Sequence, residues 1–192
     1  MAGFRTYTAV LDACVLYPAS LRDLLLSLAV NGIYHARWTH DIQEEWIRNV
    51  VEKRPELDAT KLRRTQTVMN AAIDDCLIEG YHSLIDSLEL PDKNDRHVLA
   101  AAIIGHADAI VTFNLKDFPE RVVSQFGIEV LHPDDFVMLQ YDLKQLDVLA
   151  AVKAMRARLK NPPKSVAQFL EKLELQGLPQ TYLELKKASD LI

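Results

Sequence analysis

The chain has 192 residues, of which 49% are hydrophobic, and a formal net charge of −5 at neutral pH. These values are typical of an ordinary globular protein, with one domain and a small appendage or with one large domain. The negative charge argues against a protein that coats nucleic acid nonspecifically, although a local basic strip is compatible with it. Two cysteines allow neither a disulfide framework nor a Cys-x-x-Cys metal site.

No stretch of the sequence has the pattern of a membrane span or a leader. The apolar stretch near the N-terminus, YTAVLDACVLY, is interrupted by Asp12, so we do not expect a signal peptide. The other apolar runs are shorter than the roughly 20 residues that a bilayer requires. The sequence therefore predicts a cytoplasmic protein without a membrane segment.

Predicted strands and helices alternate over the first two thirds of the chain. Runs of β-branched and apolar residues predict strands, whereas leucines at helical spacing, capping residues and prolines delimit helices. The expected strands cover residues 6–16, 33–38, 108–114 and 128–133. The expected helices cover residues 18–32, 42–54 (capped by Thr39 or Asp41), 58–79, 96–107 and 134–139. This alternation indicates an α/β fold with a mainly parallel central sheet.

From about Gln140 onward the pattern changes to helices alone. Ser165 and Gln168 form a predicted capping box for one helix, and Pro179 opens the last one. The helix before them is expected to present six apolar residues on one side: Leu143, Leu146, Leu149, Val152, Met155 and Leu159. We therefore divide the chain into an α/β domain, residues 1–138, and a C-terminal helical extension, residues 139–192.

Asp12 is the most informative single acid, because apolar residues surround it in VLDACV. An unpaired carboxylate in such a strand is costly, and its pKa would rise. Asp12 could cap a turn or pair with an arginine. It also lies at or near the carboxyl end of the first strand, which is where open parallel sheets bind ligands.

Two further pairs of acids lie where helices begin. Asp92 and Asp95 could act as N-cap and N3 residues of the helix in LPDKNDRHVLAAAI, or one or both could hold a metal ion. Glu44 and Glu45 lie in the first turns of an earlier helix. Adjacent helix positions point about 100° apart, so at most one of these glutamates is expected to face a site.

Acids gathered at one sheet edge are most easily explained by a bound cation. Asn114 ends the third predicted strand, and Asp117 follows three residues later. Carboxylates within about 5 Å of one another repel by roughly 3 kcal/mol per pair at an effective dielectric near 20. Mg²⁺ or Mn²⁺, which prefer oxygen ligands, would relieve this repulsion. No glycine-rich nucleotide loop, nucleophile elbow or His-Glu-x-x-His motif indicates another chemistry.

In chain order, four acidic motifs resemble those of the PIN-domain ribonucleases. They are VLDACVL, THDIQEEWIRNV, PDKNDRHVLAAAI and IVTFNLKDFP. Within that family the sequence looks like the toxins of the virulence-associated-protein-C (VapC) type, and its tail is similar to the C-terminal extension of one VapC-like subgroup. The resemblance covers about residues 6–136. It implies a PIN-like three-layer α/β/α fold.

The resemblance implies catalytic roles for four acids, with Mg²⁺ or Mn²⁺ as the cofactor. Asp12 matches the acid of the first strand, and Glu45 the acid before a bulky apolar residue, here Trp46. Asp95 matches the aspartate that opens the D-x-H-V-L-A-A-A helix. Asp117 is expected to supply the fourth carboxylate.

The last motif departs from the common pattern of the family. Many PIN domains have Thr-x-Asp after the final core strand, whereas here Thr112 is followed by Phe113 and Asn114. Asn114 can bind a metal ion through its amide oxygen but brings no charge, so the number of metal ions stays open. Thr112, Asn114 and Asp92 are therefore expected as accessory residues.

The implied reaction is metal-dependent hydrolysis of an RNA phosphodiester bond. Arg48, Lys116, Arg156 and Arg158 are candidate RNA-binding residues, although such cations are as readily explained as solvated helix surface. A VapC-like toxin implies a cognate antitoxin that inhibits it, and the apolar helix faces permit a homodimer.

Two other functions are compatible with the same residues. The chain could be a degenerate PIN module that binds RNA or a protein partner without catalysis, which Asn114 favours. Alternatively, the acids could all be helix caps and surface charges of a partner-binding α/β protein. Metal binding separates these possibilities, because a metal ion stabilises only a folded protein that has a site for it.

Overall fold

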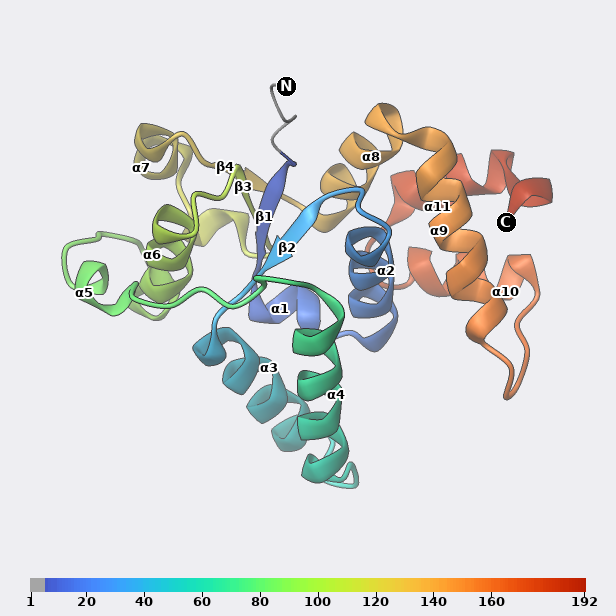
Figure 1. Cartoon of the computed structure of the whole chain (residues 1–192), viewed down its shortest axis with the longest axis horizontal. Coiled ribbons are helices and arrows are strands. Elements are labelled where there is room, and N and C mark those ends of the chain that lie inside the picture. Colours follow the sequence, from blue (N-terminus) through green and yellow to red (C-terminus); the bar gives the residue numbers. More distant parts are fainter. Residues whose placement is uncertain (1–5) are drawn as a thin grey trace. The chain divides into compact units, whose positions relative to one another are not determined.

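The computed structural model describes residues 6–192 (Figure 1). The chain forms two compact units. The first unit consists of Met1–Tyr17 and His35–His132, and the second of Pro18–Tyr34 and Pro133–Ile192. The unit boundaries follow contacts in space, so a segment near the N-terminus joins the C-terminal helices. The division after residue 138 stays a prediction, and residues 1–5 of that first domain lie outside the described residues.

A parallel sheet forms the centre of the first unit. Its strands are β1 (Thr8–Leu11), β2 (His35–Arg37), β3 (Ala109–Val111) and β4 (Glu129–Leu131), in the order β2-β1-β3-β4. Val10 of β1 lies opposite Arg37 on one side and Ile110 on the other. All residues of β1 and β3 are buried, as expected for central parallel strands covered by helices. This sheet confirms the predicted α/β class.

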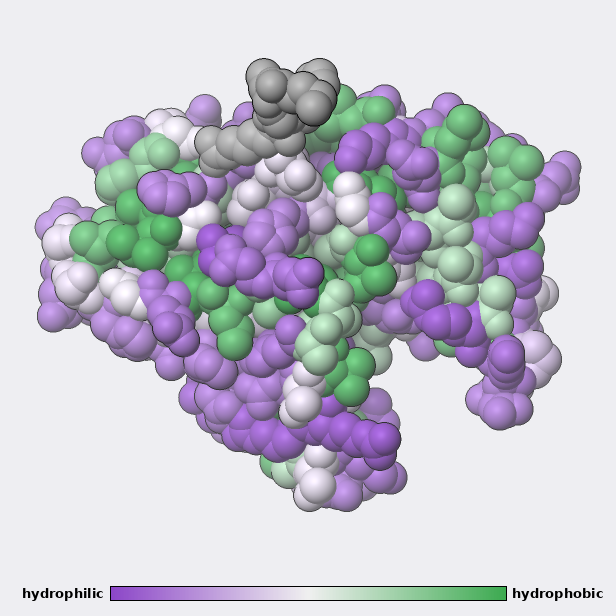
Figure 2. Space-filling view, viewed as in Figure 1, coloured by the Kyte–Doolittle hydropathy of each residue, from purple (hydrophilic) through white to green (hydrophobic). Residues whose placement is uncertain are grey.

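Helices surround the sheet of the first unit. They are α1 (Ala13–Leu16), α3 (His40–Lys53), α4 (Ala59–Ala72), α5 (His82–Ile85), α6 (Arg96–Ile104) and α7 (Glu120–Val123), with the 3-10 turns η1 (Lys93–Asp95), η2 (Leu115–Asp117) and η3 (Ser124–Phe126). α6 packs against β1 and β3, and α3 packs against α1 and α4. Three consecutive buried alanines, residues 100–102, give α6 a small side-chain surface for this close approach. The surface over α3 and α4 is mostly hydrophilic (Figure 2), and α4 buries only Met69.

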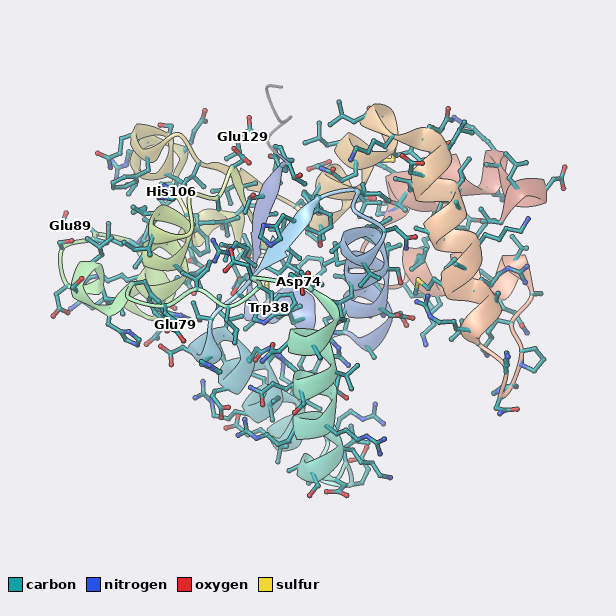
Figure 3. All side chains as sticks on the ribbon, viewed as in Figure 1. Trp38, Asp74, Glu79, Glu89, His106 and Glu129 are labelled. Carbon is teal, nitrogen blue, oxygen red and sulfur yellow. The ribbon has the colours of Figure 1, made fainter. Side chains whose placement is uncertain are left out.

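Two predicted elements of the first unit end five or more residues before their predicted end. The strand predicted over residues 6–16 ends at Leu11, because Asp12 caps the short helix α1. The helix predicted to Glu79 ends at Ala72, because the chain that follows it pairs with Trp38. The Trp38 N–H donates to the Cys76 carbonyl oxygen at 2.9 Å. Figure 3 labels Trp38 together with Asp74, which comes two residues before Cys76 in the sequence. The short helix α5 was not expected from the sequence.

The second unit is entirely helical in its described part. Its elements are α2 (Ala19–Val30), α8 (Pro133–Leu143), α9 (Gln145–Arg158), α10 (Val166–Glu174), α11 (Pro179–Lys187) and the 3-10 turn η4 (Ser189–Leu191). α2 packs against α9 and α10, and α8 packs against α9 and α11. The predicted capping box between Ser165 and Gln168 is confirmed at the start of α10. Among residues 6–192, no helix combines the length and the apolar character that crossing a bilayer requires.

The apolar side predicted for the tail helix is only partly buried. Leu149, Val152 and Met155 of α9 are buried, whereas Leu143 and Leu146 are exposed. The reason is a break in the helix at Lys144, which separates α8 from α9 and changes the direction of the apolar face.

Candidate active site

Asp12 lies directly after β1 at the carboxyl edge of the sheet, with only 3% of its surface exposed. Its backbone N–H donates to the Val111 carbonyl oxygen of β3 at 3.1 Å. Its Oδ1 accepts from the Ala13 N–H at 2.6 Å, and its Oδ2 accepts from the Thr112 hydroxyl at 2.6 Å and from the Cys14 thiol at 3.1 Å. Burial raises the pKa of Asp12 above its ordinary value, although these hydrogen bonds act in the opposite direction. The carboxylate is therefore fixed in orientation.

Backbone groups that follow β3 support this arrangement. The Asn114 N–H donates to Thr112 Oγ1 at 2.9 Å, and the Phe113 N–H donates to Cys14 Sγ at 3.2 Å. Burial, followed by the charge of Asp12, raises the pKa of the Cys14 thiol, so this thiol stays protonated and can donate to Asp12. Cys14 is thus a hydrogen-bonding partner of the predicted catalytic acid.

Asp95 is half-buried at the end of η1, and its Oδ2 has no hydrogen-bond partner within the described part of the chain. Burial raises its pKa to about 7, and the negative charges of Asp12, Asp92, Asp117 and Glu45 contribute to this shift in that order. The other three predicted catalytic acids therefore all act electrostatically on Asp95, although only Glu45 and Asp95 of the four line the cleft described below.

The two explanations offered for the Asp92–Asp95 pair apply to different residues. Asp92 is a cap, because its Oδ1 accepts from the Asn94 N–H at 2.8 Å at the start of η1. Asp95 makes no capping hydrogen bond, although α6 begins directly after it. The capping interpretation is thus confirmed for Asp92 alone. The oxygen without a hydrogen-bond donor among the described residues is Oδ2 of Asp95.

A cleft of about 600 Å³ opens beside Asp95, between the first turns of α3 and the start of α6. Five acids contribute to its lining: Asp41, Glu44, Glu45, Asp92 and Asp95. Asn114 also lines this cleft, which places the departure from the family pattern at its wall. An opening with this many acids repels polyanions unless cations are present.

The two adjacent glutamates of α3 have different partners. Both line the cleft, contrary to the expectation that at most one would face a site. Glu44 forms an ion pair with Arg63 of α4, and hydrogen bonding from that guanidinium group lowers the pKa of Glu44. Glu45 Oε2 instead lies 3.5 Å from His97 Nε2, and this pair is the less exposed of the two. Glu45 is thus the glutamate without a permanently charged partner, as its predicted role requires.

The predicted RNA-binding residues differ in their surroundings. Arg48 is exposed at the cleft and, within residues 6–192, has no ion pair closer than 4 Å. Lys116 is exposed in η2. Both belong to the first unit, which also contains the acidic cluster.

Arg156 and Arg158 belong to the second unit and are engaged there. Arg156 donates to the carbonyl oxygens of Lys164 and Ile192, and Arg158 forms an ion pair with Asp23 of α2 at 3.1 Å. These contacts hold the helices of that unit together. A role in RNA binding for these two arginines stays a prediction.

The chemistry of the cluster fits a hard divalent cation. Carboxylate oxygens predominate, one of them lies buried without a donor, and the like charges around Asp95 would be relieved by a dication. As placed in the described residues, however, no three acidic, histidine or cysteine side chains converge closely enough to enclose an ion.

Sequence reasoning missed three polar residues of the site: Cys14, Asp41 and His97. A partial signal existed, since His97 lies two residues after Asp95 and Cys14 two residues after Asp12. No local pattern indicates that His97 would reach Glu45, because that contact joins α6 to α3.

Comparison with known families decides how this arrangement is classified. Residues 8–116 match the family described as the PIN domain, and residues 133–187 match the family described as the VapC50 C-terminal domain. The chain belongs to the PIN-domain family. The predicted PIN-like three-layer α/β/α fold, with a helical C-terminal extension, is confirmed by this membership together with the parallel sheet.

A curated relative supports the VapC-like assignment. The chain is 41% identical over 101 residues to a protein of Mycobacterium tuberculosis (strain ATCC 25618 / H37Rv) named "Putative ribonuclease VapC50". The matched region covers 53% of this chain and 59% of that relative, which is less than two thirds of its length. No solved protein structure matches the chain significantly. The PIN-domain protein described here is thus VapC-like in sequence.

Proposed function

We propose that this protein is a metal-dependent endoribonuclease that hydrolyses RNA phosphodiester bonds. The observation that carries the proposal is Asp95, a half-buried carboxyl group with a bare oxygen and four like charges around it. Such an arrangement is unfavourable in a purely structural acid and is typical of functional sites. Membership of the PIN-domain family and a relative named as a ribonuclease support the same activity.

In this proposal Asp12, Glu45, Asp95 and Asp117 hold Mg²⁺ or Mn²⁺. A bound ion of this kind supplies an activated water molecule and neutralises charge that develops on the phosphate. Asp92 caps η1 and contributes negative charge beside Asp95. Asn114 offers an amide oxygen at the cleft wall, where a carboxylate would add a further like charge.

The residues around these acids have positioning and binding tasks. The Thr112 hydroxyl and the Cys14 thiol hold the Asp12 carboxylate in one orientation. Arg48 and Lys116 are exposed cations of the same unit and would donate hydrogen bonds to phosphate oxygens of RNA. Arg156 and Arg158 are proposed as further RNA contacts with a smaller contribution, because their guanidinium groups already serve the second unit.

We also propose that the protein is the toxin of a toxin–antitoxin pair and acts in the cytoplasm. The partner would be a small antitoxin protein whose basic side chain enters the acidic cleft. A homodimer is the assembly that we expect from the VapC-like resemblance. These proposals depend on the relative and on the sequence pattern more than on any single contact.

A specific observation favours one alternative function. Asn114 lines the cleft where many PIN domains carry an aspartate, and no three acids of the described residues enclose an ion. A degenerate PIN module with these features would bind RNA or a protein partner without catalysis. This alternative predicts RNA binding that is independent of divalent metal ions.

The decisive experiment is cleavage of a mixed RNA pool with Mn²⁺, with EDTA, and with EDTA followed by excess Mn²⁺. The wild type is compared with Asp12→Asn and Asp95→Asn, which keep the shape of the side chain but remove its charge. Glu89→Gln is the matched control, because Glu89 is an exposed acid on the outer side of the loop near α5 (Figure 3). We expect metal-dependent cleavage in the wild type and the control, and a loss of about 100-fold or more in both site variants.

The opposite results are equally informative. Intact RNA at every Mn²⁺ concentration, together with RNA binding in EDTA, would favour the non-catalytic module. Cleavage that survives EDTA or both substitutions would contradict the assignment of the metal site. Cleavage by the wild type that only one variant loses would assign the essential charge to that residue alone.

A further inference from the structure

A stacked pair of rings stands beside the acidic cleft and has no part in the chemistry proposed above. The rings of Tyr81 and His82 lie face to face, with centroids 4.2 Å apart and planes inclined by 25°. Tyr81 is buried, with 2% of its surface exposed, whereas 69% of the His82 side chain is exposed. In this pair the Tyr81 ring is therefore buried and the His82 ring is open to solvent.

Both rings are held in place by one carboxylate. The Tyr81 hydroxyl donates to Asp41 Oδ2 at 2.6 Å, and His82 Nε2 lies 3.4 Å from the same oxygen. Asp41 is in the first turn of α3 and lines the cleft that also contains Asp95. The stack is thus fixed in orientation and adjoins the proposed reaction site.

From this geometry we propose that His82 is a base-stacking platform, a subsite for one nucleobase of single-stranded RNA next to the scissile phosphate. The inference rests on the proposed function and deepens it by assigning a contact to the base rather than to the backbone. An open ring face attracts the face of any base, since every base presents a π-surface. The platform therefore favours single-stranded RNA, in which bases are free to stack on a protein.

The charge of Asp41 decides which part of the RNA occupies this position. A phosphate group next to that carboxylate would be repelled, whereas an uncharged base would not. Arg48, on the other hand, is an exposed cation of the cleft without an ion pair in the described chain. We therefore place the base on His82 and the neighbouring phosphate near Arg48.

Three variants test the platform, with kcat and KM measured on a short single-stranded RNA that the wild type cleaves. His82→Ala removes the ring and should raise KM about 5- to 50-fold with kcat nearly unchanged. His82→Phe keeps an aromatic ring without a charge and should restore KM to within about threefold of the wild type. The matched control is His40→Ala, because His40 is an exposed histidine at the start of α3 and stacks on no other ring within residues 6–192.

An abasic substrate series provides a second readout that a merely structural role would not change. Removing the base at one particular position should raise KM for the wild type, and the same removal should have little further effect on His82→Ala. Unequal effects of this kind identify the base that contacts His82. A KM of His82→Ala equal to that of the wild type, or equal losses across the whole abasic series in both proteins, would overturn the platform. Failure of His82→Phe to restore KM would also overturn it, because a charge contact would then explain the loss.

Equilibrium binding of the same RNA in EDTA separates this inference from the proposed function. If the wild type binds RNA but does not cut it, the nuclease proposal fails, and the platform is judged on whether His82→Ala weakens binding by the same factor. If the wild type neither binds nor cuts single-stranded RNA, both proposals are wrong. Thermal unfolding of each variant checks that the exposed substitutions leave the fold intact.

Discussion

Two aspartates at the beginning of helices, one in each unit, differ sharply in how their charges are satisfied. Asp134, in the first turn of α8, is 2% exposed and accepts from the Gln180 N–H at 2.8 Å, the Thr181 N–H at 2.9 Å and the Thr181 hydroxyl at 2.7 Å. Asp95 is half-buried, with no donor for its Oδ2 among the described residues and with acids around it. Both oxygens of the Asp134 carboxylate thus accept hydrogen bonds from the protein, whereas Oδ2 of Asp95 is available to bind a ligand.

This difference shows what a structural acid and a functional acid require. Asp134 caps α11 from a neighbouring helix, because the first N–H groups of a helix have no partner within the helix. Burying its charge is tolerated since each oxygen receives donors. Around Asp95 the sequence supplies charges of the same sign instead, which costs stability in the metal-free protein. That cost is explained if a cation completes the site.

The largest effect that we expect on stability comes from the structural acid. Asp134→Ala leaves the Gln180 and Thr181 donors unsatisfied and should lower the free energy of unfolding by about 3 kcal/mol. Asp95→Ala should leave it unchanged or raise it, since repulsion is relieved. Urea denaturation in EDTA measures both, with Asp135→Ala as the control because Asp135 is exposed. Equal losses for the Asp134 and Asp95 variants would remove the distinction between them.

The stability gained on metal binding should depend on the two acids in the opposite way, little on Asp134 and strongly on Asp95. At a Mn²⁺ concentration about 100 times its Kd, the wild type should gain roughly 2.7 kcal/mol of stability. Asp134→Ala should gain a similar amount relative to its own metal-free form, whereas Asp95→Asn should gain almost none. Thermal unfolding with increasing Mn²⁺ measures these gains. A gain retained by Asp95→Asn would show that the ion binds elsewhere.

Features that depend on residues close in the sequence could be predicted, whereas features that depend on contacts between distant segments could not. Capping of α3 by Thr39 and the capping box at Ser165 were predictable, because both hydrogen bonds lie within one helical turn. A buried strand leading to Asp12 was predictable from its run of apolar residues, whereas its exact end at Leu11 was not. The premature end of α4 was not, since it depends on pairing with Trp38, more than 30 residues earlier.

The site followed the same rule. The order of the acidic motifs singled out Asp12, Glu45 and Asp117, and the charges of these three residues all contribute to the raised pKa of Asp95. The contact between His97 and Glu45 joins two helices far apart in the sequence, so no local pattern announced it. The donors that surround Asp134 were hidden in the same way, because they come from α11. Local signals therefore predicted the acids but not the partners that distinguish them.

A smaller effect is expected in the dependence of stability on pH. The pKa of Asp95 is about 7 in the folded protein, compared with an ordinary value of 3.8, so the folded state holds a proton that the unfolded state releases. The contribution of Asp95 to stability therefore falls as pH rises from about 4 to about 7, and is constant above that range. We expect a loss of about 1–2 kcal/mol, because solvent screens a half-exposed carboxyl group.

The variant Asp95→Asn should lack this part of the pH dependence. Urea denaturation in EDTA at several pH values, for the wild type and the variant, gives the difference between the two curves. Other groups titrate in both proteins, so only that difference is assigned to Asp95. A difference that is flat between pH 4 and pH 7 would mean that the Asp95 carboxyl is ionised throughout.

The smallest effect that we expect is on Mn²⁺ affinity and comes from Cys14, a hydrogen-bond donor that Asp12 has and that Asp95 lacks. Asp12 is nearly as buried as Asp134 but owes one of its hydrogen bonds to the weak thiol donor of Cys14. Cys14→Ala removes this donor and also the acceptor of the Phe113 N–H, so the orientation of the carboxylate should be less well fixed. We expect the Kd for Mn²⁺ to rise about fivefold, which corresponds to roughly 1 kcal/mol.

The conservative variant Cys14→Ser keeps a donor at the same position. Its hydroxyl group should maintain the hydrogen bond to Asp12 Oδ2, so the Kd for Mn²⁺ should stay at or below the wild-type value. Titration of each protein with Mn²⁺ measures this without reference to cleavage. If Cys14→Ala and Cys14→Ser weaken binding equally, the thiol serves packing, and the Thr112 hydroxyl and the Ala13 N–H orient the acid. If only Cys14→Ala weakens Mn²⁺ binding, the thiol hydrogen bond orients Asp12. Asp12 then resembles Asp134 in being held by donors of the protein, and resembles Asp95 in binding the proposed metal ion.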